Sequence, residues 1–171
     1  RRHPADPPGQ ADELAPLRHG RVVQAWSAGS DPARSWPTRT ELVGQMSSLA
    51  HCAVHVSICS SMALDGAMFD RPQVGPTFIP GANRKVSRSV AALYRQEHWQ
   101  PIARSGGVAP AGDESSLIAA IADGLAHPEH GRTERARLVG EVLTYTDGRS
   151  SSRLVSEVDR VLQTGLESSS A

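Results

Sequence analysis

The stretch AVHVSICSSMALDGAMFDRPQVGPTF, residues 53–78, decides the fold class of this 171-residue chain. It opens with a short β-branched run, residues 53–58, which is typical of a buried strand. A helical pattern follows over about residues 61–70, and Pro72 ends it because proline cannot continue a helix. Residues 73–78 form a second short apolar run and are predicted as the next strand. Strand, helix and strand in this order make a β-α-β unit, and such units build parallel sheets with right-handed crossovers.

Strand and helix patterns alternate through the rest of the chain. TRTE at 38–41 matches a capping box in front of an amphipathic helix that extends to about Ala50. The other predicted elements are strands at 21–26 and about 101–109, a short helix around 90–94, a helix capped by Asp113, and helices at about 132–145 and 151–166. The alternation predicts one α/β domain, with a Rossmann-like parallel sheet of about four to five strands and helices on both faces.

The strand at 54–58 is expected at the centre of this sheet. We assign residues 1–166 to the domain and residues 167–171 to a disordered tail. The chain opens with RRHPADPPGQ and has no initial methionine, so we interpret it as an N-terminally truncated piece of a longer protein.

Composition excludes several classes of protein. Lys plus Arg and Asp plus Glu both number 18, so the net charge is zero and the basic face that nonspecific nucleic-acid binding requires is not expected. No apolar run approaches the roughly 20 residues of a membrane-spanning helix. The chain has 2 cysteines, which is too few for a disulfide framework and favours a reducing compartment.

Ser60 and Ser61 stand between the predicted strand and helix, where ligands bind in open α/β sheets. Their hydroxyls and the first amides of the helix suit a diphosphate, because the helix N-terminus is positive. Asp65 lies one turn beyond Ser61 on the same helix face, where an acid can accept hydrogen bonds from ribose. These residues together predict a nucleoside-diphosphate site. A plainer interpretation stays open, in which the serines cap the helix and Asp65 faces water.

Four motifs follow one another along the chain: RRHPAD at 1–6, SSMALDGAMFDRP at 60–72, YRQEHWQPIARSGGV at 94–108 and TDGRSSSRL at 146–154. This set resembles the donor-binding domain of GT-B fold glycosyltransferases. The resemblance is strongest to bacterial surface-polysaccharide enzymes and their CDP-glycerol glycerophosphotransferase relatives. The family's helix acid is usually Glu, where this chain has Asp65, and its strand before the serines usually opens with Asp, where this chain has HCAVHV.

The resemblance implies the donor-binding half of an enzyme that transfers a sugar or alditol phosphate from a nucleotide-activated donor in surface-polysaccharide synthesis. It implies that His3 is a catalytic residue in the cleft, and that Arg1 and His98 bind substrate beside the two serines and the acid. An acceptor-binding N-terminal domain would lie outside this chain. A cytoplasmic location, with peripheral contact at the inner membrane face, follows from where activated sugars are made. No cofactor and no nucleic-acid partner are expected.

Two other functions stay open: a non-hydrolysing sugar-nucleotide 2-epimerase, which shares the donor site, and a non-catalytic nucleotide-binding module. A metal site in HCAVHVSIC is not expected. Zinc needs its ligands about 2.0–2.3 Å from one point. On a strand, His51, His55 and Cys59 would instead spread over about 26 Å, with Cys52 on the other face. Both cysteines are predicted to be small buried hydrophobes.

Overall fold

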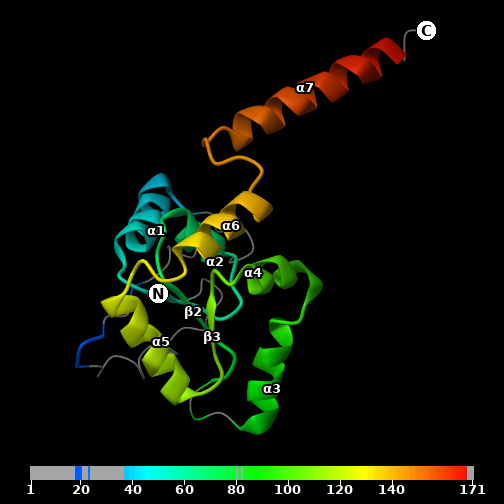
Figure 1. Ribbon diagram of the computed structural model, residues 1–171. Helices are drawn as coiled ribbons and strands as arrows, with labels where there is room; N and C mark the ends of the chain where they lie inside the picture. Colours follow the sequence, from blue (N-terminus) through cyan, green and yellow to red (C-terminus); the bar gives the residue numbers. More distant parts are fainter. Residues whose placement is uncertain (1–17, 21–22, 24–36, 80, 82, 169–171) are drawn as a thin grey trace.

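The computed structural model of the chain describes residues 18–20, 23, 37–79, 81 and 83–168 (Figure 1). Within these residues, three strands form a parallel sheet in the order β1-β2-β3. The strands are β1 His55–Val56, β2 Gln73–Pro76 and β3 Ala109–Ala111. The α/β class and the parallel β-α-β unit predicted from residues 53–78 are therefore confirmed.

The predicted order of the sheet is wrong for these three strands. β2 pairs with β1 through His55 and Gln73, and with β3 through Val74 and Ala109, so β2 is the central strand. β1, which was expected at the centre, has β2 as its one neighbour among the described residues. The strand predicted at 21–26 lies outside the described residues, apart from Val23.

Seven α-helices and one 3-10 helix lie in the described part of the chain. They are α1 Arg39–His51, α2 Met62–Met68, α3 Arg84–Leu93, η3 Glu97–Trp99, α4 Gln100–Ser105, α5 Glu114–Ala126, α6 Arg132–Val142 and α7 Ser150–Ser168. The capping box of α1 is formed as predicted: Glu41 N–H donates to Thr38 Oγ1 at 3.3 Å, and Thr38 N–H donates to Glu41 Oε2 at 2.8 Å. Asp113 caps α5 in the same way.

The predicted strand at 101–109 is wrong over most of its length, because residues 100–105 form the helix α4. Pro101 lies in the first turn of this helix, where a missing N–H costs no intrahelical hydrogen bond. Gly106 ends the helix with φ 75°, a left-handed conformation that glycine adopts without strain. The strand β3 begins only at Ala109.

Helices cover both faces of the sheet. Gly66 of α2 lies so close to Gln73 of β2 that a Cβ there would overlap the Gln73 amide. Gly124 of α5 lies against Pro72 and Val54, with a Cβ position 3.0 Å from each. Because neighbouring residues of a strand point to opposite faces, α2 and α5 lie on opposite sides of the sheet.

The buried core lies on the α2 side of the sheet, between α2, α4 and α6. Its members are apolar and almost fully buried: Ala63, Ala67, Trp99, Ile102, Val108 and Leu138. Tyr94 packs against this core with its ring edge-to-face on Trp99, at 5.7 Å between ring centroids. The core fixes α2, and therefore the loop in front of it, against the sheet.

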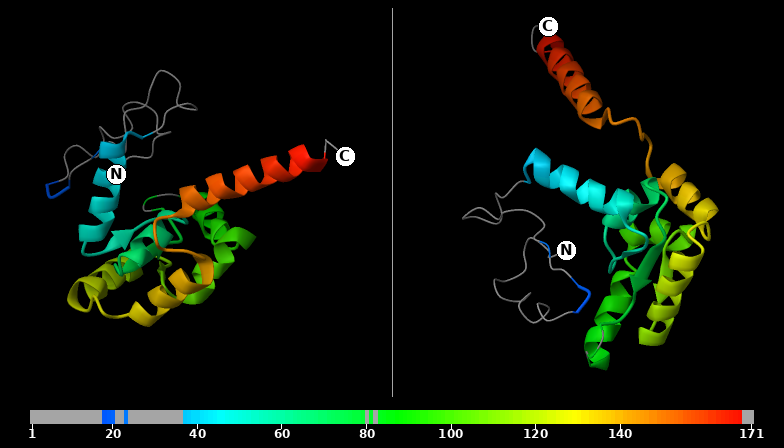
Figure 2. Two further views of the ribbon diagram at one scale, coloured as in Figure 1. Left: turned by 90° about the horizontal axis from the view of Figure 1, so that it is seen from above. Right: turned by 90° about the vertical axis from the view of Figure 1, so that its left-hand side faces the viewer.

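The last helix, α7, extends away from the sheet and the other helices (Figures 1 and 2). Its apolar side chains are exposed, namely Leu154, Val155, Val158, Val161 and Leu162. The helix predicted at 151–166 is thus present, and it continues to Ser168. None of the helices in the described ranges has both the length and the apolar character needed to cross a membrane.

Candidate functional site

Loops meet at the carboxyl edge of the sheet, because the three strands are parallel. The Ser57–Ser61 loop connects β1 to α2 at this edge. Thr77, just after β2, donates to the carbonyl of Ala111 at the end of β3, from N at 2.8 Å and from Oγ1 at 3.1 Å. These two hydrogen bonds join the carboxyl ends of β2 and β3.

Ser60, which precedes the N-cap residue Ser61, accepts hydrogen bonds from the first amides of α2. Its Oγ accepts from the N–H of Met62 at 3.2 Å, and its carbonyl accepts from Ala63 N–H at 3.0 Å. The carbonyl of Ser61 accepts from Leu64 N–H at 2.9 Å. The plainer interpretation thus holds for Ser60, and the first amides of α2 are already engaged.

The hydroxyl and the amide of Ser61 have no hydrogen-bond partner among the described residues, although its carbonyl does. Its side chain is exposed and makes no capping hydrogen bond. In the part of the chain that the structure describes, the backbone N–H groups of Ser60 and Ser61 donate to no acceptor. The loop therefore presents two amide donors and one hydroxyl, which is the donor set that an anionic oxygen accepts.

Tyr94 holds the Ser57–Ser61 loop in place. Its hydroxyl accepts from Cys59 N–H at 3.1 Å and donates to the carbonyl of Pro76 at 2.9 Å, with the carbonyl of Ser57 at 3.4 Å. Burial raises the pKa of Tyr94, so the hydroxyl stays protonated and able to donate. A Cβ at Gly75 would lie 3.0 Å from this hydroxyl, so glycine leaves room for it. One side chain thus joins the loop to the end of β2.

Asp65 lies one turn into α2 and is half-buried. Burial raises the pKa of its carboxyl, and the charge of His55 on β1 acts in the opposite direction without overcoming it. His55 in turn shares a hydrogen bond with Gln73, at 2.7 Å between Nδ1 and Oε1. The carboxyl of Asp65 is therefore partly buried, whereas the plainer interpretation had it facing water.

The structure does not connect the remaining predicted site residues to this loop. His98 is exposed in η3, beside the buried Trp99, and no hydrogen bond or ion pair joins it to another described residue. Arg1 and His3 lie outside the described residues. Ser60 and Ser61 are neighbours in this loop, whereas Asp65, one turn further along α2, lies close enough to His55 of β1 for the charge of His55 to act on its pKa.

Sequence reasoning left open whether Tyr94, the first residue of the motif at 94–108, lies in the binding cleft. The signal was incomplete because its partners lie 18 to 37 residues away along the chain. Only the tertiary structure shows that its hydroxyl reaches them.

The four residues His51, Cys52, His55 and Cys59 do not gather into a metal site among the described residues. Both cysteines are free and partly buried, and burial raises the pKa of each thiol. One other group can hold an ion, namely His127, Glu129 and His130 after α5.

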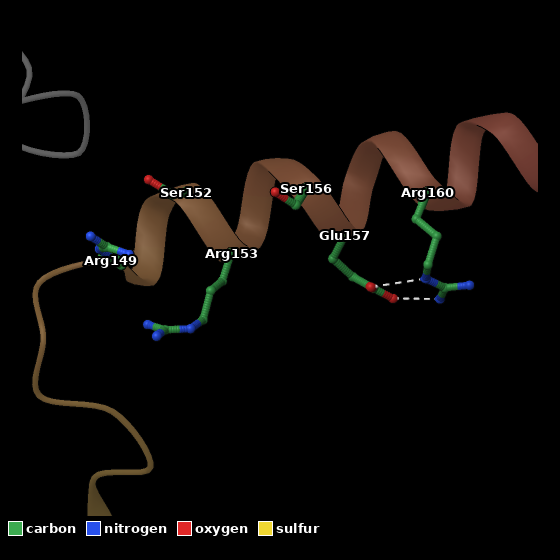
Figure 3. A pocket seen from close by; sticks show the side chains of 6 residues that line it. All are labelled: Arg149, Ser152, Arg153, Ser156, Glu157 and Arg160. Carbon is green, nitrogen blue, oxygen red and sulfur yellow. Dashed lines mark hydrogen bonds and ion pairs between the residues drawn. The ribbon is translucent and has the colours of Figure 1, made fainter.

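Two hollows in the described surface lie away from the Ser57–Ser61 loop. One lies along α7 and is lined by Arg149, Ser152, Arg153, Ser156, Glu157 and Arg160 (Figure 3). These six side chains come from one helix and the residue before it, with an ion pair between Glu157 and Arg160. A second hollow lies between α2 and α6, beside Asp70 and Arg132. Neither of these two hollows is lined by a residue of the Ser57–Ser61 loop.

Comparison of the chain with known protein families, with curated proteins and with solved structures finds no match.

Proposed function

We propose that this chain binds the nucleotide-activated donor of a glycosyltransferase-like enzyme, a nucleoside-diphosphate sugar or a CDP-alditol. The observation that carries the proposal is the Ser57–Ser61 loop, with the free amides of Ser60 and Ser61 and the exposed hydroxyl of Ser61 at the carboxyl end of β1. This is the edge at which open α/β sheets bind their ligands.

In this function the loop donors bind the diphosphate and stabilise the negative charge that develops on it as it leaves. Asp65 orients the ribose by accepting from its hydroxyls. By resemblance, His3 contacts the transferred group, and Arg1 and His98 bind the remainder of the donor. Because such donors are made in the cytoplasm, we place the function there, with peripheral contact at the inner membrane face.

Titration of UDP, CDP and GDP by calorimetry tests the proposal. Ser61→Ala removes a hydroxyl that makes no capping bond, so it should weaken binding without lowering the melting temperature. A hydrogen bond to a charged group is worth roughly 1.5–3 kcal/mol, which corresponds to a loss of about one to two orders of magnitude in affinity. Ser60→Ala should also lower the melting temperature, because it removes a cap worth about 1 kcal/mol.

The matched control is Ser48→Ala on α1, whose hydroxyl bonds to the carbonyl of Gly44 within its own helix. This variant should bind nucleotide as the wild type does. Equal affinities for Ser61→Ala and wild type, or no binding of any of the three nucleotides, would overturn the proposal.

A further inference from the structure

Two histidines and a glutamate come together in the turn that follows α5. The ligand atoms of His127, Glu129 and His130 all lie within 4.8 Å of one another, and the three side chains are exposed. The imidazole rings of the two histidines are stacked at 4.7 Å between centroids, with 21° between their planes. Glu129 Oε1 lies 3.7 Å from His127 Nδ1.

The backbone of this turn is held rigidly. His130 N–H donates to the carbonyl of His127 at 3.0 Å, and Pro128 between them has a fixed φ. The guanidinium of Arg135, which is 2% exposed, donates from Nη1 to the carbonyl of His130 at 2.6 Å and from Nη2 to that of Pro128 at 2.9 Å. Asp70 in turn accepts from Arg135 Nε at 2.8 Å. A buried arginine therefore fixes the positions from which the ligand side chains project.

An acid orients one of the histidines. His130 Nδ1 lies 3.2 Å from both carboxyl oxygens of Asp123, which stands in the last turn of α5. When Nδ1–H donates to this carboxylate, Nε2 is left free with its lone pair. Metal-binding histidines almost always have such an outer partner.

The surrounding charge favours a cation. Asp123 and Glu129 supply two carboxylates, and His127 is the C-terminal cap of α5, where the helix dipole is negative. Arg132 directs its guanidinium to Asp70, and the charge of Arg135, which also bonds to the backbone of the turn, is paired with the same carboxylate.

We propose that His127, Glu129 and His130 bind a divalent first-row transition-metal ion of the Zn²⁺ type, with Asp123 as a positioning residue. Two imidazoles, a carboxylate and a fourth position open to water form a donor set that zinc uses in proteins. Bonds of about 2.0–2.2 Å in a tetrahedron place the donor atoms about 3.3 Å apart. The three donors lie within 4.8 Å of one another, so the farthest pair would have to approach by no more than about 1.5 Å.

This site lies near the amino ends of the strands, whereas the Ser57–Ser61 loop lies at their carboxyl ends. α5 starts just after β3, at the carboxyl edge, and Gly124 near its end packs against Pro72 and Val54, which precede β2 and β1. We therefore expect metal binding there to leave nucleotide affinity unchanged.

Titration of the full chain with ZnCl₂ by calorimetry tests the proposal, with one ion per chain expected. The variant with both His127→Ala and His130→Ala should lose this binding. Asp123→Asn, which keeps all three ligands, should weaken it by about 10- to 100-fold. His51→Ala removes an exposed histidine on α1 and should leave it unchanged. Melting curves should show that the variants fold, because Arg135 bonds to the backbone of the turn.

Ring-nitrogen NMR supplies a readout that a purely structural role would not change. On addition of Zn²⁺, the Nε2 resonance of His130 should shift while Nδ1 keeps its proton. Equal zinc affinities for the double variant and for His51→Ala, or an unshifted Nε2 of His130, would overturn the proposal.

Discussion

Asp70 accepts from Nε of the buried Arg135 at 2.8 Å, across 65 residues of sequence. Asp70 also accepts from Arg132 Nε at 2.7 Å, so one carboxylate between α2 and β2 binds two arginines of α6. Its φ is 51°, a left-handed conformation that a residue other than glycine rarely adopts. The contact joins α6 to the loop between α2 and β2 and, through Arg135, holds the turn at His130.

Replacement of this acid, Asp70→Asn, should destabilise the fold. Burial raises the pKa of Asp70, but the hydrogen bonds and charges of Arg135 and Arg132 outweigh it, so the pKa lies below its ordinary value. The stabilisation is therefore complete above the ordinary pKa and is lost as pH falls through the folded-state pKa. Because the carboxyl is 42% exposed, we expect a cost of about 1–2 kcal/mol at neutral pH.

Urea unfolding at neutral and acidic pH measures this effect, and the difference between Asp70→Asn and wild type should shrink in acid. The control is Glu157→Gln on α7, which breaks an exposed ion pair with Arg160 and should hardly change stability. A pH-independent difference for Asp70→Asn would contradict the assignment.

Tyr94→Phe should loosen the Ser57–Ser61 loop while the ring stays packed on Trp99. Without the hydroxyl, Cys59 N–H and the carbonyl of Pro76 lose their partner, at a cost of about 1–2 kcal/mol in unfolding free energy. Affinity for nucleoside diphosphates should fall as well, because the loop amides are no longer held in place.

Thermal melts and nucleotide titrations measure both effects. Tyr145→Phe is the control, since Tyr145 is 57% exposed and meets Arg153 through its ring face, which phenylalanine retains. The role given to Tyr94 would be contradicted if Tyr94→Phe bound nucleotide as tightly as the wild type, or if Tyr145→Phe lost its affinity.

Asp65→Asn should stabilise the unliganded protein at neutral pH. Burial raises the pKa of Asp65, so the folded state binds the proton more tightly than the unfolded state does. Stability of the wild type therefore rises as pH falls, and above the raised pKa the charged form carries a penalty that asparagine avoids. The melting temperature of the variant should exceed that of the wild type at pH 7 and converge with it in acid. A lower melting temperature at pH 7 would contradict this interpretation.

Two glycines in helices should respond to alanine with opposite sign. At Gly66 a Cβ would overlap the Gln73 amide, which bonds to His55 and to the carbonyl of Arg71, so Gly66→Ala should cost about 1–3 kcal/mol. At Gly140 in α6 a Cβ meets open space, so Gly140→Ala should gain up to about 1 kcal/mol in helix propensity. Chemical denaturation measures the change in unfolding free energy of each variant. Changes of the same sign in both variants would be inconsistent with the packing of α2 on the sheet.

The sequence by itself determined the features that depend on residues close together along the chain. The caps at Thr38 and Asp113 bond to residues three positions away, so TRTE and the start of α5 were readable directly. The β-α-β unit over residues 53–78 was readable too, because a β-branched run and a helical pattern separated by serines are local signals. The pair of serines before α2 was also visible, together with both interpretations of it.

The tertiary structure alone decided the order of the strands, the anchoring of the loop by Tyr94 and the burial of Arg135 against Asp70. Each of these depends on hydrogen bonds between groups far apart in sequence, which no local pattern encodes. The segment after Pro101 shows the same limit, because its apolar residues are compatible with a strand or with a helix. In the structure the segment is helical and Ile102 packs in the core. Residues a few positions apart determine where a helix or strand begins and ends. Contacts with residues distant in sequence determine whether an ambiguous segment becomes helix or strand, and which side chains meet.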